Sequence, residues 1–243
     1  GGDAPLSVAD ALADKGLPAV GVPKTIDNAV AETDFCIGFD TATTTVADAL
    51  DKLHTTATAH HRVIVVEVMG RDAGWVAVVG GLAGGADYIV VPEAPTTIDE
   101  LCAHLKKRRD AGKKFAIVVV SEGAKFTDLP ENDDLGEKDA FGHVRLDKRS
   151  VGELVAKEIE RRIGFEARMV VLGHLQRGGS PTVFDRVLAT RLGVAATDYV
   201  KEKKWGYMPA LVGDKIVPVL IRDAIANNKG VNLELYELAK IFY

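Results

Sequence analysis

The sequence predicts an α/β protein with a largely parallel sheet, and three observations support this fold class. Short apolar runs rich in valine and isoleucine alternate with longer segments of helical pattern, which is the order that a parallel sheet requires. The apolar runs are nearly continuous, as expected of strands that are buried on both faces. Glycine and proline stand at most of the crossings between these segments.

Five strands and five helices follow from this pattern. The strands are expected at residues 19–22, 63–68, 88–91, 115–120 and 169–172. The helices are expected at residues 6–15, 41–60, 98–111, 150–163 and 184–201. The segment 126–147 is rich in acidic residues and lacks periodicity, so we expect an exposed excursion after the fourth strand.

Composition excludes several classes of protein. The chain has 243 residues and a formal net charge of −5, which argues against a nucleic-acid surface. Its two cysteines form no CxxC pair, which indicates a reducing compartment and a cytoplasmic location. The most apolar stretch, residues 75–86, is too short for a bilayer, which needs about 20 residues. The chain starts at Gly1 without a methionine, so we expect either processing or a start that is not the gene's own.

Polar side chains follow four of the five predicted strands, at the edge where open α/β sheets bind ligands. They are Lys24, Thr25 and Asp27 after the first strand, Arg71 (behind Met69 and Gly70) after the second, Glu122 after the fourth, and His174 and Arg177 after the fifth. Taken singly, each has an ordinary structural explanation, such as a turn or a surface ion pair. Taken together, the cations and carboxylates suit an anionic substrate that carries hydroxyl groups.

Other common chemistries lack their motifs. The sequence contains neither the GxxxxGK[ST] loop of P-loop nucleotide sites nor the GxGxxG fingerprint of dinucleotide sites. It also contains neither HExxH nor GxSxG, so zinc peptidases and serine hydrolases have no support.

At these clusters the sequence resembles the 6-phosphofructokinases. The matching segments occur in family order and read GGD, GVPKTIDN, HHRVIVVEVMGRDAGW, VVSEGAK and LGHLQRGGSP. The resemblance implies two Rossmann-like, three-layer α/β/α domains with mostly parallel sheets. It places a phosphoryl-donor domain at residues 1–38 and 176–226 and a sugar-phosphate domain at residues 39–175 and 227–243. Family members are longer on the N-terminal side, so we expect the first domain to be incomplete there.

The resemblance also implies a reaction, the transfer of a phosphoryl group to the 1-hydroxyl of fructose 6-phosphate with Mg²⁺. Asp27 matches the general base, Thr25 a residue that lines the transferring group, and Asp3 a carboxylate of the magnesium site. Met69, Gly70, Arg71 and Glu122 match sugar-binding positions, and Arg71 would also stabilise developing charge. His174 and Arg177 match residues that grip the 6-phosphate. Arg62 and Arg168 match arginines that reach this phosphate from a neighbouring subunit, which implies a homodimer or homotetramer.

Two residue patterns depart from the family. Ala29 stands where the family usually has a second aspartate, and Ala4-Pro5 follows GGD in place of Gly-Ser or Gly-Thr. Ala29, together with the shorter N-terminal side, motivates a second hypothesis, a non-catalytic sugar-phosphate-binding or regulatory homologue. The donor is also open between diphosphate and ATP. Lys24 resembles the lysine of diphosphate users and gives that donor a slight preference, with ATP almost level.

Overall fold

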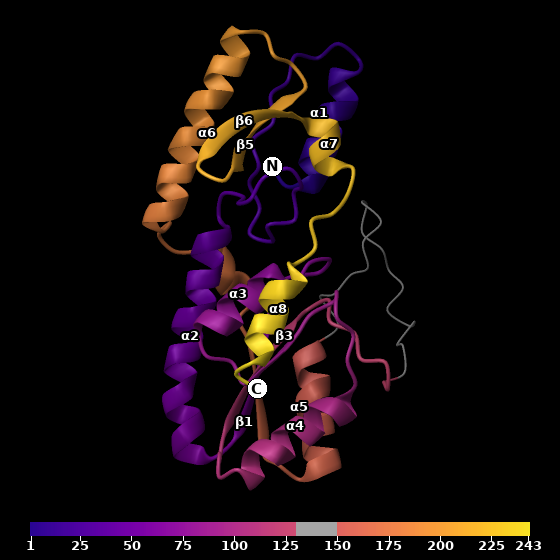
Figure 1. Cartoon of the computed structure of the whole chain (residues 1–243), viewed down its shortest axis with the longest axis vertical. Helices are drawn as coiled ribbons and strands as arrows, with labels where there is room; N and C mark the ends of the chain where they lie inside the picture. The colour runs from indigo at the N-terminus through magenta and orange to yellow at the C-terminus, as the bar shows by residue number, and fades with distance from the viewer. Residues whose placement is uncertain (130–149) are drawn as a thin grey trace. The chain divides into compact units, whose positions relative to one another are not determined.

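The computed structural model describes residues 1–129 and 150–243, and these form two compact units (Figure 1). The first unit consists of Gly1–Ala42 and Arg177–Gly230, and the second of Thr43–Gln176 and Val231–Tyr243. The predicted excursion at residues 126–147 lies mostly outside the described residues. None of the helices in the described parts is long and apolar enough to cross a membrane.

The described elements alternate between helix and strand along much of the chain. In order they are α1 (Asp3–Ala13), α2 (Phe39–His60), β1 (Val63–Val68), α3 (Trp75–Ala83), β2 (Tyr88–Val90), α4 (Ile98–Asp110), β3 (Ala116–Ser121), α5 (Val151–Ile163), β4 (Ala167–Val171), a 3-10 helix η2 (Gly173–Arg177), α6 (Val183–Lys201), β5 (Tyr207–Val212), β6 (Lys215–Leu220), α7 (Ile221–Ile225) and α8 (Leu233–Lys240).

The second unit contains a four-stranded parallel sheet in the order β2-β3-β1-β4. Val63 at the start of β1 pairs with Ala116 of β3 and with Ala167 of β4, so these three neighbouring strands start level with one another. Their carboxyl ends therefore meet at one edge of the sheet, where polar residues follow. The predicted α/β class with a parallel sheet is confirmed.

Helices cover both faces of this sheet, as the three-layer prediction requires (Figure 1). On one face, apolar residues of α4 and α5 pack against β1 and β3 in a continuous core. On the other face, α3 contacts β2, β3 and α8. Gly80 of α3 and Gly84 at its C-cap allow α2 to approach closely, because a β-carbon on Gly80 would lie 2.7 Å from Val46 and one on Gly84 would lie 2.6 Å from Leu50.

One carboxylate is buried inside this core. Glu67 of β1 is 6% exposed and faces the start of α5. Its Oε2 accepts hydrogen bonds from the backbone N–H of Gly152, at 2.7 Å, and from the Ser150 hydroxyl, at 3.0 Å. A negative charge at a helix N-terminus satisfies donors that have no partner inside the helix. Glu67 thus joins the strand that leads to Met69 with the helix that covers it.

The two outer strands of the sheet differ in how they are covered. Residues 169–172 were expected to be buried on both faces, and this is wrong, since Met169 and Val171 of β4 are exposed. The reason is that β4 is an edge strand with α5 on one face. At the opposite edge, Ile89 of β2 donates its backbone N–H to the Tyr243 hydroxyl at 2.8 Å, and its carbonyl oxygen accepts from the Tyr236 hydroxyl at 3.3 Å.

The first unit is built around an antiparallel hairpin of β5 and β6 rather than the parallel sheet that was expected for it. One face of the hairpin packs against α1 and α7, and the other packs against α6. The predicted strand at residues 19–22 is not formed. Gly206 donates to Ala19 and Gly21 donates to Tyr207, but Gly206 has a left-handed φ of 79°, which interrupts a regular ladder.

A single carboxylate joins two helix starts within the first unit. Asp185, in the first turn of α6, is 2% exposed. It accepts hydrogen bonds from the backbone N–H groups of Gly38 and Thr41, both at 2.8 Å, at the start of α2. The N-cap of α6, Thr182, in turn donates its hydroxyl to Asp40 at 2.6 Å. The beginnings of α2 and α6 are therefore held together by reciprocal capping.

Candidate active site

In the first unit, the segment PKTIDN forms a fixed loop around Thr25 and Asp27. The Thr25 hydroxyl donates to Oδ2 of Asp27 at 3.2 Å, and the backbone N–H of Asp27 donates to the same hydroxyl oxygen at 3.2 Å. Both side chains are half-buried. The loop therefore presents a carboxylate and a hydroxyl in a defined relationship. Such a pair can accept a proton and line a phosphoryl group.

The segment that contains Gly2 and Asp3 lies beside this loop. A β-carbon on Gly2 would be 3.3 Å from the Thr25 side chain, and the backbone N–H of Lys24 donates to the carbonyl oxygen of Gly1 at 2.9 Å. Asp3 is exposed and is the first residue of α1, with Pro5 in the same turn. Proline is tolerated there because its missing N–H has no acceptor within the helix. The structure thus brings Asp3, Lys24, Thr25 and Asp27 to neighbouring segments.

In the second unit, the exits of β1 and β3 interlock. Gly70 has a φ of 139°, which disfavours any residue with a β-carbon, and its carbonyl oxygen accepts a short hydrogen bond from the Ser121 hydroxyl. Gly123 donates its backbone N–H to the same carbonyl oxygen at 3.1 Å. The backbone N–H of Gly70 donates to Oε1 of Glu122 at 3.4 Å. Arg71 and Glu122, both half-buried, therefore lie on two loops that fix each other.

The exit of β4 joins the same cluster through Gln176, which is 1% exposed. Its Oε1 accepts from the backbone N–H of Met69 at 3.2 Å, and its Nε2 donates to the carbonyl oxygen of Gly173 at 3.1 Å. His174 is exposed on the same 3-10 helix. The structure thus brings Met69, Gly70, Arg71, Glu122 and His174 to one edge of the sheet. Arg177, the last residue of η2, is exposed and begins the next segment of the first unit.

Arg62 and Arg168 lie at the amino ends of the strands of this sheet, opposite the carboxyl ends where Met69 and His174 lie. Arg62 directly precedes β1, and Arg168 is the second residue of β4. Both pair with Glu166, Arg62 at 2.9 Å and Arg168 at 2.6 Å. The hydrogen bond from Arg62, followed by the charges of both arginines, lowers the pKa of Glu166. Neither arginine therefore belongs to the strand-exit cluster of its own chain.

The donor set of the first unit fits Mg²⁺ only in company with a phosphate. The described residues contain no cluster of three or more histidine, cysteine, aspartate or glutamate side chains that could hold a metal alone. Mg²⁺ is commonly bound by one or two carboxylates together with substrate phosphates. Asp3 and Asp27 on neighbouring segments meet that description.

Sequence reasoning missed three residues that shape these loops, namely Gln176, Asn28 and Lys229. Gln176 and Asn28 stand inside the segments HLQRGG and TIDN, so their position was a usable signal. Lys229 lies outside every quoted segment, and only its contacts in the structure identify it.

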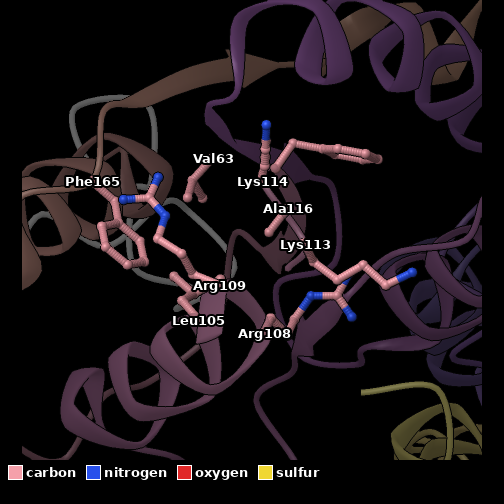
Figure 2. A pocket seen from close by; sticks show the side chains of 9 residues that line it. Val63, Leu105, Arg108, Arg109, Lys113, Lys114, Ala116 and Phe165 are labelled. Carbon is pink, nitrogen blue, oxygen red and sulfur yellow. The ribbon is translucent and has the colours of Figure 1, made fainter. Parts of the chain in front are cut away.

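A pocket outside these loops lies at the amino ends of β1 and β3 (Figure 2). Val63 and Ala116, the first residues of those strands, line it together with Arg108, Arg109 and Phe165. Figure 2 shows the Arg109 guanidinium over the ring of Phe165, 3.4 Å from its centroid. Arg108 pairs with Asp87 at 2.5 Å. The pocket therefore stands at the opposite end of the strands from Met69 and Glu122.

Comparison with known proteins identifies the family. The family model described as "Phosphofructokinase" matches residues 1–200. The chain belongs to the phosphofructokinase family. This confirms the resemblance seen in the sequence, and the loops described above are the loops of a phosphofructokinase.

Curated relatives of this phosphofructokinase carry two kinds of name. The pyrophosphate–fructose 6-phosphate 1-phosphotransferase of Amycolatopsis mediterranei is 51% identical over 248 residues, covering 100% of this chain and 70% of the relative. The ATP-dependent 6-phosphofructokinase of Corynebacterium efficiens is 46% identical over 247 residues, with the same coverage. The chain thus spans 70% of the length of both relatives. Because the names of these relatives divide between diphosphate and ATP as donor, the slight preference for diphosphate is not confirmed.

Solved phosphofructokinases share the fold. The pyrophosphate-dependent phosphofructokinase from Marinobacter aquaeolei matches with a TM-score of 0.75 and 26% identity, covering 94% of this chain and 58% of that chain. The phosphofructokinase from Saccharomyces cerevisiae matches with a TM-score of 0.73 and 30% identity, covering 98% of this chain and 30% of that chain.

Proposed function

We propose that the protein transfers a phosphoryl group from diphosphate or ATP to the 1-hydroxyl of fructose 6-phosphate, giving fructose 1,6-bisphosphate and releasing orthophosphate or ADP. The observation that carries this proposal is the fixed pairing of Thr25 with Asp27 beside the Gly2–Asp3 segment. Relatives that are about half identical are named for this reaction with either donor. Phosphoryl transfer needs little covalent chemistry, and its rate depends on positioning and on stabilising charge.

The site residues of the first unit serve proton transfer and magnesium binding in this proposal. Asp27 accepts the proton of the 1-hydroxyl as that oxygen attacks phosphorus, and the Thr25 hydroxyl orients the carboxylate. Asp3 contributes to holding Mg²⁺, which would neutralise the donor phosphates when bound. A carboxylate within hydrogen-bond reach of a hydroxyl can contribute about 10²–10⁴-fold as a general base.

The site residues of the second unit bind the sugar phosphate in this proposal. The backbone at Met69 and Gly70 and the carboxylate of Glu122 bind sugar hydroxyls, and His174 binds the 6-phosphate, as does Arg177 of the first unit. Arg71 binds the sugar and also stabilises the charge that develops during transfer, because a guanidinium binds phosphate oxygens in bidentate fashion.

Diphosphate is the proposed donor, with ATP close behind. Lys24 is exposed and directly precedes Thr25, and its backbone is tied to Gly1 and bridged to Ile37. An ammonium at this point can balance a compact anion that lacks an adenosine. Ala4 leaves room for either donor.

A homodimer or homotetramer is the proposed assembly. Arg62 and Arg168 lie at the amino ends of their strands, at the edge of the sheet opposite Met69 and His174. This placement supports a role in the 6-phosphate site of a neighbouring subunit. Size-exclusion chromatography with light scattering tests it directly, since a monomer would contradict it.

The non-catalytic alternative rests on Ala29 and is less well supported, because the loop that carries Asp27 is formed despite that alanine. The test uses protein made from the whole reading frame that encodes this chain. It is mixed with fructose 6-phosphate, Mg²⁺ and either diphosphate or ATP, and fructose 1,6-bisphosphate is measured. Formation of the bisphosphate with one donor supports the enzyme. Tight binding of fructose 6-phosphate without turnover would favour the regulatory homologue.

A further inference from the structure

The residue after Asp27 is fixed in both its backbone and its side chain. Asn28 is 1% exposed and has a left-handed φ of 52°, a conformation that asparagine tolerates better than most residues. Its Nδ2 donates to the carbonyl oxygen of Asp34 at 3.1 Å, and its Oδ1 accepts from the backbone N–H of Cys36 at 2.9 Å. The side chain of Asn28 therefore closes residues 28–36 into a loop that ends beside Asp27.

One side of this loop is anchored to β5. The backbone N–H of Asp34 donates to the carbonyl oxygen of Leu211 at 2.7 Å, and the backbone N–H of Leu211 donates to the Thr33 hydroxyl at 3.0 Å. A strand of the hairpin is a rigid support. The position of Asp27 therefore depends on how well residues 28–36 stay seated against the rest of the unit.

Lys229 holds the same loop from a part of the chain that lies outside every sequence motif. Its Nζ donates to the carbonyl oxygens of Thr33, at 2.6 Å, and Asp34, at 3.0 Å. Its backbone N–H donates to the carbonyl oxygen of Ala29 at 3.0 Å. Lys229 thus contacts both the beginning and the end of the loop. Burial lowers the pKa of Lys229, which places the ammonium in a poorly solvated environment where its hydrogen bonds are strong.

We infer that Lys229 is a positioning residue for Asp27, acting through residues 28–36. This inference rests on the proposed function, in which Asp27 is the general base. Removal of the ammonium takes a charged donor from the adjacent carbonyl groups of Thr33 and Asp34 and so loosens the loop that these residues help to hold in place. A displacement of about 1 Å in a catalytic group can lower the rate by about 10²-fold.

The first experiment compares Lys229→Met with wild type, using protein from the whole reading frame. We expect kcat to fall about 10- to 100-fold while KM for fructose 6-phosphate changes by less than about twofold, since the proposed sugar-binding residues other than Arg177 belong to the other unit and Lys229 contacts none of them in the hydrogen bonds described above. Lys229→Arg keeps the charge and should recover part of the lost kcat. Lys201→Met is the matched control, because Lys201 makes an exposed pair with Asp198 at 3.0 Å on α6.

A double-mutant cycle separates positioning of Asp27 from a general loss of stability. In an Asp27→Asn background, Lys229→Met should change kcat by less than about twofold, because there is no longer a general base to position. An equal loss in both backgrounds, or an unchanged kcat in the single variant, would overturn the inference.

Hydrogen exchange gives a readout that does not depend on turnover. The amide of Cys36, which donates to Asn28, should exchange at least about ten times faster in Lys229→Met than in wild type or Lys201→Met. Equal exchange in all three proteins overturns the inference, whatever the kinetics. If the Cys36 amide exchanges faster in Lys229→Met than in wild type, but wild type forms no fructose 1,6-bisphosphate, the proposed function fails while the contact of Lys229 with the loop is still supported.

Discussion

Gly123 lies directly against the backbone of Arg71: a β-carbon on residue 123 would be 1.9 Å from the carbonyl oxygen of Arg71. That distance is far below van der Waals contact, and the opposing atom is backbone, so it cannot move aside at low cost. Glycine at this position is therefore what allows the exit of β3 to pack against the exit of β1.

Gly123→Ala should disturb the sugar-binding loops and the fold together. We expect KM for fructose 6-phosphate to rise at least about tenfold and the free energy of unfolding to fall by about 1–3 kcal/mol, as in other overpacked sites. Steady-state kinetics and thermal unfolding measure the two effects. Gly193→Ala in α6 is the control, because nothing lies within 4 Å of the added carbon. It should be neutral or stabilise by up to about 1 kcal/mol. Equal behaviour of the two variants would contradict the close approach.

Asp27→Asn should lower kcat by about 10²–10⁴-fold with little change in the affinity for fructose 6-phosphate, because it removes the proton acceptor and leaves the sugar-binding loops intact. Kinetics together with calorimetric binding of the sugar phosphate check this. A variant that keeps more than about a tenth of the wild-type kcat would remove Asp27 from the mechanism.

Ala29→Asp should raise turnover or magnesium affinity. The half-buried Ala29 follows Asn28 in the loop of Asp27, so a new carboxylate there adds an oxygen ligand of the kind that Mg²⁺ prefers. Magnesium titration of turnover measures the effect. If neither turnover nor the magnesium dependence changes, the alanine is not a defect in the metal site.

Lys24→Gly should lower kcat/KM for diphosphate much more than for ATP. Loss of one charged hydrogen bond to phosphate costs about 1.5–3 kcal/mol, or roughly 10- to 150-fold. Parallel kinetics with both donors decide the matter. Similar losses with the two donors would show that Lys24 does not select the donor, and a wild-type enzyme that uses only ATP would overturn the preference for diphosphate.

The Cys36 thiol should resist alkylation in the native protein. Burial raises the pKa of Cys36 from its ordinary value of 9.0 to about 11, so the reactive thiolate is roughly a hundredfold scarcer than in a free cysteine. Iodoacetamide labelling at pH 7–9, followed by peptide mass spectrometry, should therefore be slow at Cys36. The rate should rise about tenfold with each pH unit toward 11. Rapid labelling at neutral pH would contradict the burial of this side chain.

Much of the second unit could be predicted because its elements carry strong local patterns. The run VIVVEV forms β1 with the predicted bounds. The helix α4 begins at the predicted Ile98 because Thr97 and Glu100 form a capping box at its N-terminus. The helix α3 escaped prediction because its residues are almost uniformly apolar and include glycines, so periodicity gives no signal. The hairpin escaped because each of its strands contains a proline, and the structure pairs Pro209 with Pro218.

The candidate site shows the same division. Residues inside contiguous motifs, such as Thr25 and Glu122, could be found because their residue types and their place after a strand indicate chemistry. Lys229 could not, because it lies outside every motif and acts by hydrogen-bonding to backbone groups of a distant segment. No local pattern records which backbone groups a folded chain will bring to a side chain.

The reciprocal capping by Asp185 has a consequence for biosynthesis. Gly38, which donates to this carboxylate at the start of α2, is synthesised 147 residues before Asp185. At about 5–20 residues per second, the first turn of α2 waits roughly 7 to 30 seconds for its acceptor. During that interval the emerging chain carries a long helix whose first amide groups can bond only to water or to a chaperone. The order of translation therefore delays closure of the first unit until its second segment, Arg177–Gly230, has followed residues 43–176 of the second unit.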